Sequence, residues 1–114
     1  MNSVNLVGNL TRDPKLFEQE DKSFIAKFDI ATEYGYDAEK KEPRVEFVNI
    51  TAFGISAAFA PYLKTGRKVS VMGRVGNDSY TDKEGKKVYA TTVKVSNGQL
   101  RLVDSSKKSK EEAD

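Results

Sequence analysis

Residues 45–53 have the sequence VEFVNITAF and form the most informative stretch of this chain. Because side chains alternate between the two faces of a β-strand, these residues divide into two sets. One set is apolar and suits the interior of a barrel: Val48, Ile50 and Ala52. The other set places two polar residues between Phe47 and Phe53. At roughly 3.3 Å per residue the two rings would lie about 20 Å apart, so the stretch predicts a strand with one core face and one aromatic face.

The segments on either side of this strand repeat the alternation and predict a mostly β domain. We expect further strands at residues 4–10, 24–32, 68–75, 88–95 and 99–103. Asp13 and Pro14 interrupt the first strand, because proline cannot donate a ladder hydrogen bond. Residues 33–44 are polar and charged and predict a long loop or a mobile hairpin. Residues 82–86, with the sequence DKEGK, predict a hairpin turn.

A single helix is predicted at residues 55–63, with Ser56 as its N-cap and Gly66 just past its end. Pro61 lies inside that segment, so we expect a short, kinked or divided helix. The order of three strands, helix and two strands is that of an all-β OB-fold, a five-stranded Greek-key barrel with the helix between strands 3 and 4. An SH3-like barrel has no place for this helix. Gly73 falls on the apolar side of its strand, where a missing side chain permits a sharp bend.

The chain has 114 residues, of which 38% are hydrophobic and 32% charged, so it has room for one domain. We expect an OB-fold domain over residues 1–103 and a disordered, charged tail over residues 104–114. No apolar run approaches the length of a membrane span. Residues 1–10 lack the layout of a signal peptide, and cysteine is absent, so we expect a cytoplasmic protein.

Histidine is absent as well as cysteine. These two absences exclude zinc sites built from His and Cys, Ser-His triads and Cys-His nucleophilic pairs. The acidic residues gather in turn-like stretches such as 37–42 and 82–84, and no glycine-rich phosphate loop of the GxxxxGK type occurs. We therefore expect a protein without catalytic activity, bound metal or cofactor.

Aromatic and basic residues are interleaved, which suits single-stranded nucleic acid because rings stack on bases and cations follow phosphates. We expect stacking on Tyr34, Tyr36, Phe47, Phe53 and Tyr80. We expect phosphate contacts from Arg12, Lys40, Lys41, Arg44, Arg74, Lys86 and Lys87. The net charge is only +2, so such binding depends on where the charges lie rather than on their sum. Stacking tolerates any base, so sequence preference should be weak.

These residues are also compatible with ordinary structural roles. Phe47 and Phe53 could pack under the helix or in a subunit interface. Tyr34 and Tyr36 could be plain loop residues, and the lysines of residues 83–87 could simply solvate a hairpin tip. The sequence pattern leaves these alternatives open.

Several short motifs occur in order along the chain: VGNLTRDP at 7–14, FDIAT at 28–32, YLKTG at 62–66, VMGR at 71–74 and YTDKEGKKVY at 80–89. Together they resemble the bacterial and phage family of single-stranded DNA-binding (SSB) proteins over residues 1–103. The resemblance implies an OB-fold homotetramer, with a dimer as the alternative. It also implies coating of single-stranded DNA in replication, recombination and repair, in the cytoplasm of a bacterium or of a cell infected by a phage.

The resemblance assigns base stacking to Tyr36, Phe47, Phe53 and Tyr80. In many relatives all of these positions except Phe53 carry tryptophan, whereas this sequence contains none, so weaker stacking is expected. Relatives typically end in an acidic tip with the sequence Ile-Pro-Phe, which recruits other enzymes. Residues 111–114 are acidic without that hook, so we expect no recruitment of replication or recombination proteins by that route.

Two other classes of function stay open. One is an OB-fold adaptor that binds proteins of a replication or recombination complex and binds single-stranded DNA weakly. The other is an RNA chaperone of the cold-shock type, which shares the barrel. It ranks last because its Lys-Gly-Phe-Gly-Phe type of aromatic stripe is not found in this sequence.

Overall fold

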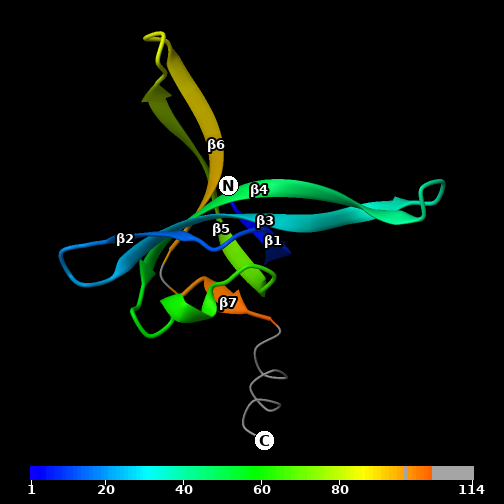
Figure 1. Cartoon of the computed structure of the whole chain (residues 1–114), viewed down its shortest axis with the longest axis horizontal. Coiled ribbons are helices and arrows are strands. Elements are labelled where there is room, and N and C mark those ends of the chain that lie inside the picture. The colour runs from blue at the N-terminus through cyan, green and yellow to red at the C-terminus, as the bar shows by residue number, and fades with distance from the viewer. Residues whose placement is uncertain (97, 104–114) are drawn as a thin grey trace, which may run out of the picture.

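The computed structural model describes residues 1–96 and 98–103. Its elements in chain order are β1 (Val4–Leu10), β2 (Lys15–Glu18), β3 (Phe24–Asp37), β4 (Glu42–Ile55), the 3-10 helix η1 (Ala60–Tyr62), β5 (Lys68–Thr81), β6 (Lys87–Val95) and β7 (Leu100–Leu102). Strands β1, β3, β4, β6 and β5 are hydrogen-bonded in that order, and the last of them, β5, also pairs with the first, β1 (Figure 1). These strands close a ring, which confirms the five-stranded OB-fold barrel predicted from the sequence. The expected tail, residues 104–114, lies outside the described residues.

The interior of the ring holds the apolar face of each strand. In β4, Ile50 is 1% exposed and Ala52 is 0% exposed, as the alternation of residues 45–53 predicts. The buried apolar cluster comprises Leu10, Ala26, Phe28, Ile30, Ile50, Ala52, Ile55, Ala60, Leu63, Val69, Val71, Val93, Val95 and Leu100. Because these side chains leave water together, their burial is the main force that holds the ring closed.

The segment between β4 and β5 is short and divided, as Pro61 predicts, but its only helix in the described chain is the 3-10 helix η1 and not an α-helix over residues 55–63. Ser56 does cap this segment, because its Oγ accepts the Phe59 N–H at 3.1 Å. A single turn follows and continues as η1, which contains Pro61. Proline has no N–H to donate to the preceding turn, so a longer α-helix cannot form here. The segment instead contributes Ala60 and Leu63 to the core.

Two hairpins extend beyond the barrel (Figure 1). The radius of gyration is 15.9 Å, against about 13 Å for a compact domain of this length. The β3–β4 hairpin includes most of residues 33–44, which the sequence predicted as a loop or hairpin. The Asp37 carboxylate closes its turn by accepting the backbone N–H groups of Glu39 at 3.0 Å and Lys40 at 3.2 Å. The β5–β6 turn falls at residues 82–86, as predicted.

Strand β2, which pairs with β3 along its whole length, was not predicted from the sequence. β1 ends at Leu10, Asp13 and Pro14 lie in the break that follows it, and the chain resumes an extended form directly after them. Lys15 then lies opposite Lys27, and Phe17 lies opposite Ile25. All residues of β2 are exposed, so its four residues carry no core alternation that would mark them as a strand.

Gly73 marks the point where β5 changes neighbours. Gly73 pairs with Val4 of β1, whereas the next residue, Arg74, pairs with Lys94 of β6. A Cβ atom at position 73 would overlap the carbonyl oxygen of Lys94. The absent side chain therefore permits a close approach of β6.

Candidate functional site

An open hollow lies on the outside of the barrel, over the middle of β3, β4 and β6. We use the term outer face for the outward side of the sheet that carries Lys27, Asn49, Thr51 and Thr92. The register places Lys27 opposite Thr51 and Asp29 opposite Asn49. Since paired residues of neighbouring strands share a face, these side chains project to the same side.

The hollow has a volume of about 310 Å³. It is lined by Arg12, Asp13, Lys15, Lys27, Phe28, Asp29, Asn49, Ile50, Thr51, Asp78, Ala90 and Thr92. Its threonines are tied to the sheet, because the Thr92 hydroxyl donates to the Asn49 carbonyl at 3.1 Å and lies 3.4 Å from the Thr51 hydroxyl. The side-chain amide of Asn49 has no hydrogen-bond partner among the described residues. It is therefore available to a ligand.

Phe47 and Phe53 stand on either side of this hollow along β4. Phe47 is 69% exposed and Phe53 is 36% exposed. Both lie on the outer face, two residues beyond Asn49 and Thr51 respectively. The prediction of two outward rings on this strand is thus confirmed, and Phe47 is not packed under the turn that precedes η1.

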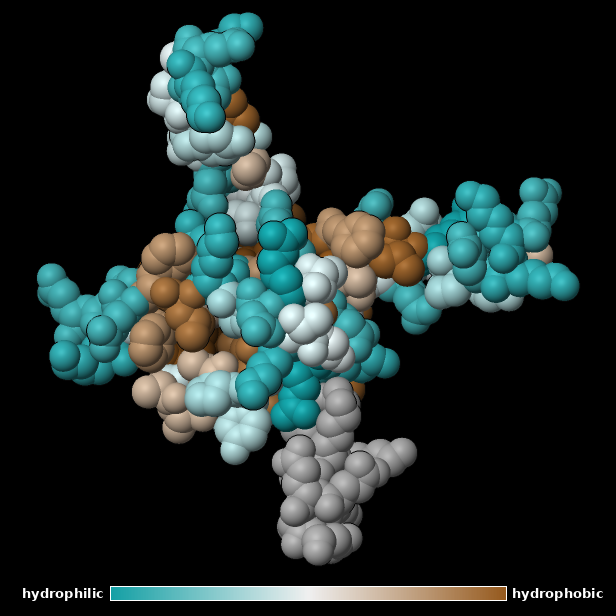
Figure 2. Space-filling view, in the orientation of Figure 1, coloured by the Kyte–Doolittle hydropathy of each residue, from teal (hydrophilic) through white to brown (hydrophobic). Residues whose placement is uncertain are grey.

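Tyr36 reaches the outer face through an irregularity in β3. Simple alternation from Ile30 would place Tyr36 on the core side. The β3–β4 register shifts between Glu33 and Gly35, however, and Tyr36 pairs with Pro43. Pro43 shares its face with Phe47, so the bulge moves Tyr36 onto the outer face. Figure 2 shows that this hairpin is hydrophobic near the barrel and hydrophilic at its tip.

Tyr34 lies at the bulge itself and is 63% exposed. It lines a second, wider hollow with Lys40, Arg44 and neighbouring residues of the same hairpin. Lys40 and Lys41 lie in the turn at the hairpin tip. Arg44 alternates with Val45 and Pro43, so its side chain projects from the opposite side of the hairpin to Phe47.

The β5–β6 hairpin carries Tyr80 on the outer face. Tyr80 pairs with Val88, and two residues earlier Asp78 pairs with Ala90, which lines the first hollow. Tyr80 is 57% exposed. Lys87 alternates onto the other side of the hairpin, where its Nζ lies 5.6 Å from the centre of the Tyr89 ring.

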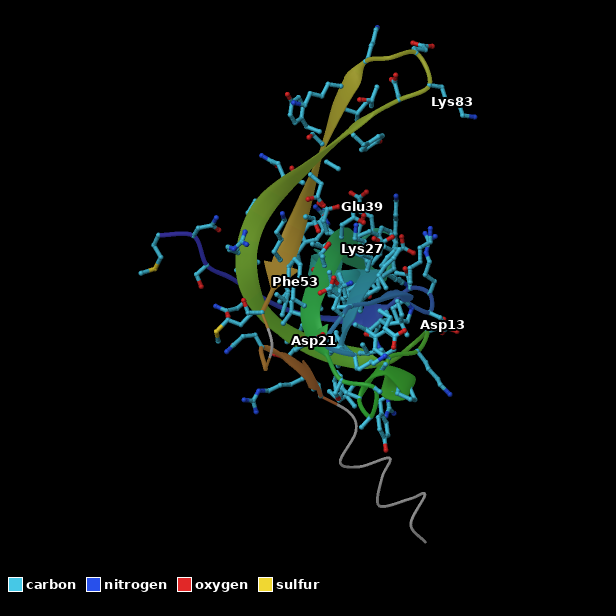
Figure 3. The ribbon with its side chains drawn as sticks, turned by 90° about the vertical axis from the view of Figure 1, so that its left-hand side faces the viewer. Asp13, Asp21, Lys27, Glu39, Phe53 and Lys83 are labelled. Atoms are coloured by element: carbon cyan, nitrogen blue, oxygen red, sulfur yellow. The ribbon has the colours of Figure 1, made fainter. Side chains whose placement is uncertain are left out.

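Lys86 lies at the base of the turn whose tip carries Lys83 (Figure 3). The turn is held by the Asp82 carboxylate, which accepts the Lys86 N–H at 2.9 Å. Arg74 lies at the other end of the hairpin, beside Lys94, and its side chain is exposed. The predicted phosphate ligands are therefore not gathered at one point: Arg12 and Arg74 lie near the barrel, and the others lie on the two hairpins.

Two ion pairs flank the first hollow. Arg12 Nη2 lies 3.6 Å from the Asp29 carboxylate. On the other side Lys94 Nζ lies 3.2 Å from the Asp78 carboxylate. The stem of Lys94 passes over Gly76, where a Cβ atom would come within 2.8 Å of its Cε. Both cations are thus held at the edge of the hollow by carboxylates that a phosphate group could replace.

Asp13 anchors the turn that positions Arg12. Its carboxylate accepts the Thr65 backbone N–H at 2.8 Å and the Thr65 hydroxyl at 3.0 Å. These hydrogen bonds, the backbone one first, lower the pKa of Asp13 below its ordinary value of 3.8. Asp13 therefore stays anionic at neutral pH and ties the end of β1 to the segment before β5.

Several residues in or beside the hollow were not singled out from the sequence: the lining residues Lys15, Lys27, Asp29, Asp78 and Thr92, and Lys94, which pairs with Asp78. Lys27 could have been found from the sequence, because it lies between two core residues of β3 and its side chain must therefore point outward. The others became visible only through the pairing of β2 with β3 and of β5 with β6. In the described part of the chain no group of three or more acids could hold a metal ion, and no helix is long and apolar enough to cross a membrane.

Comparison with known proteins gives a consistent result. The model of the family described as "Single-strand binding protein family" matches residues 1–101. A single-stranded DNA-binding protein of Halalkalibacterium halodurans is 35% identical over 94 residues, which is 82% of this chain and 56% of that relative. One of Fusobacterium nucleatum is 39% identical over 92 residues, which is 77% of this chain and 58% of that relative. The chain thus spans little more than half the length of these relatives.

A solved structure described as "Plasmodium falciparum SSB complex with ssDNA" is similar in fold. It matches with a TM-score of 0.74 and covers 91% of this chain and 96% of its own. The sequence identity is 20%, so the likeness concerns the fold. It supports the OB-fold barrel described above.

Proposed function

The chain belongs to the single-strand binding protein family, and from this premise we propose that it binds single-stranded DNA on its outer face with little sequence preference. The observation that carries the proposal is the position of Phe47 and Phe53, two exposed rings on one strand with a polar hollow between them. Every base has a π-face, so rings spaced in this way accept a strand of any sequence.

In the proposed complex, bases stack on Phe47 and Phe53, while Tyr36 and Tyr80 extend the contacts onto the two hairpins. Asn49 offers an amide to a base or sugar edge in the hollow between the phenylalanines. Tyr34, at the bulge of the β3–β4 hairpin, adds a further ring. Each stack contributes about 1–3 kcal/mol.

The backbone of the strand would follow the cations around this surface. Arg12 and Arg74 lie near the barrel. The remaining proposed phosphate ligands lie on the two hairpins: Lys40, Lys41, Arg44, Lys86 and Lys87. Arg44 and Lys87 project from the sides opposite Phe47 and Tyr80, so they would serve a strand that wraps around each hairpin rather than one that lies flat on the outer face.

We also propose that the protein assembles from identical chains, as a homotetramer or a dimer. The supporting observation is a pair of exposed apolar side chains on β1 and β5, Val7 at 51% and Met72 at 52% exposure. They lie on the outside of the barrel, in the pairs Val7–Ser70 and Asn5–Met72 of the β1–β5 ladder, which one inward-facing pair separates. Sedimentation equilibrium of the free protein tests this, because a monomer at all concentrations would contradict it.

The cellular role we propose is the coating and protection of single strands during DNA replication, recombination and repair in the bacterial cytoplasm. We propose binding without a chemical step, since the sequence offers neither histidine nor cysteine. The comparisons do not favour the alternative of an adaptor that binds proteins in place of DNA.

The test is a titration of fluorescently labelled oligo(dT) of increasing length, followed by anisotropy, with duplex DNA of the same length as the control. We expect tight binding of the single strand at low salt and little binding of the duplex. The logarithm of affinity should fall linearly with the logarithm of salt concentration, by about 0.7 per phosphate contacted. Failure to bind any length at low salt would refute the proposal.

A further inference from the structure

We propose that β2 and the adjoining part of β3 form a further DNA-binding platform, in which Phe17 stacks a base and Lys15 and Lys27 bind phosphate. This platform would continue the path of the strand past Phe53, on the side away from the β3–β4 hairpin. It rests on the proposed function, because its ligand is the same single strand.

The first argument is that Phe17 and Phe53 lie along one line across the sheet. Phe17 pairs with Ile25 of β3. Phe53 lies in the stretch of β4 opposite Ile25, between the pairs that join Phe24 to Ile55 and Ala26 to Ala52. Phe17 is 46% exposed, more than Phe53 at 36%. The two aromatic side chains therefore project to the same side of the sheet, with Ile25 between them.

The second argument concerns charge. Lys15, Lys27 and Thr51 form the neighbouring line across β2, β3 and β4. Two lysines directly opposite each other on one face repel, so this arrangement costs stability in the free protein. In the described structure neither lysine forms an ion pair. A phosphate between them would remove the repulsion, which no apolar partner could do.

The third argument is the contact between Lys27 and Phe17. The Lys27 Nζ lies 5.6 Å from the centre of the Phe17 ring. Because the ammonium lies over a face of the ring, a base that stacks there would displace it, and the cation and the ring then lie within reach of one nucleotide. Both lysines also line the hollow beside Phe53, so the platform is continuous with the proposed site.

The surroundings of the platform fit a solvent-accessible ligand site. Figure 2 shows hydrophobic side chains gathered beside the polar β2–β3 turn. Every residue of β2 is exposed. Charge complementarity with phosphate and continuity with the hollow both favour single-stranded DNA over a second copy of this chain, which would bring two more lysines to the same place.

The experiment compares oligo(dT) binding by the wild type, Phe17→Ala, Phe17→Tyr, Lys15→Gln and Lys27→Gln at several salt concentrations. Leu16→Ala is the matched control for the ring, because Leu16 is on the same strand and alternates to the other side. Arg101→Gln is the control for charge, since Arg101 lies on β7, which pairs with β5.

For Phe17→Ala we expect a loss of affinity of about fivefold or more with an unchanged salt slope, and recovery in Phe17→Tyr, which restores the ring. For each lysine variant we expect the salt slope to fall by about 0.7, the value for one phosphate contact. Both control variants should bind like the wild type. Urea unfolding of each variant shows whether the fold is retained, and Phe17→Leu replaces Phe17→Ala if the alanine variant unfolds.

Two results would contradict DNA binding by β2 and β3 and leave the proposed function of the outer face intact. One is wild-type affinity and salt slope in all the β2 and β3 variants while the wild type binds tightly. The other is a change in sedimentation of Phe17→Ala with no change in affinity, which would assign Phe17 to a subunit interface. If the wild type itself does not bind, the proposed function fails first.

Discussion

Replacement of Phe47 by alanine separates binding from folding more cleanly than any other substitution on the outer face. Phe47 is 69% exposed, whereas Phe53 is 36% exposed. A phenylalanine that is fully buried removes about 200 Å² from water. Phe47 therefore buries about 60 Å² and Phe53 about 130 Å², worth about 1.5 and about 3 kcal/mol at 25 cal/mol/Å². These values are upper bounds, because unfolded chains are partly compact.

Phe47→Ala should consequently leave a domain of ordinary stability, about 5–15 kcal/mol, folded at room temperature. If the ring stacks on a base, the variant should lose about 1–3 kcal/mol of binding free energy. That loss corresponds to a dissociation constant about 5-fold to about 150-fold higher. The assay is anisotropy of labelled oligo(dT), with urea unfolding of the same sample as the control for the fold.

Two further substitutions at this position identify the cause. Phe47→Tyr retains a π-face and should bind nearly as well as the wild type. Phe47→Leu retains apolar bulk without a π-face and should bind as weakly as the alanine variant. A dissociation constant for Phe47→Ala within about twofold of the wild type, in a folded protein, would refute stacking on this ring.

Three other predictions follow from the geometry. Asp78→Asn frees Lys94 from a partly exposed ion pair. Such a pair is worth about 0.2–1 kcal/mol, so oligo(dT) should bind up to about fivefold more tightly at low salt, as anisotropy would show. Gly73→Ala brings a Cβ onto a backbone carbonyl and should lower the free energy of unfolding by about 1–3 kcal/mol or more in urea titrations. Gly35→Ala meets nothing nearer than 3.9 Å and should be close to neutral in the same titrations. Because the pKa of Asp13 is lowered in the folded protein, its ionised carboxylate stabilises the fold at pH values above the ordinary pKa of 3.8. This stabilisation should be lost as the pH falls through the lower pKa of the folded state.

Matched controls and contrary results are available for each. Glu46→Gln removes one negative charge from the other side of the β3–β4 hairpin and should not tighten binding as Asp78→Asn does. Equal stabilities of the two glycine variants would contradict the close approach of β6 to Gly73. For Asp13→Asn, the difference in unfolding free energy from the wild type should shrink between about pH 6 and about pH 2. A difference independent of pH would contradict the role of the carboxylate.

The alternation of residues 45–53 was sufficient to predict both faces of β4. Period-two alternation is a local property, and the buried residues Ile50 and Ala52 and the exposed Phe47 follow it directly. The barrel could be predicted for the same reason, since each ring strand shows an apolar face. The short helix at residues 55–63 was also predictable from Pro61, but alanine content favoured an α-helix where the structure has only the 3-10 helix η1.

Other features depended on which strands meet. The bulge between Glu33 and Gly35 reverses the face of Tyr36, and no pattern within residues 33–44 marks the place of the shift. The same holds for Lys15, which becomes part of the hollow only because β2 pairs with β3.

By itself, then, the sequence determined the five strands of the ring, the core and the two rings on β4, because a strand's faces follow from consecutive residues. Only the tertiary structure decided which charges accompany those rings. The ion pair between Lys94 and Asp78 and the placement of Lys15 beside Lys27 arise from the register between strands. Register is set by contacts between distant segments and by bulges, and a shift of one residue moves every side chain to the other face.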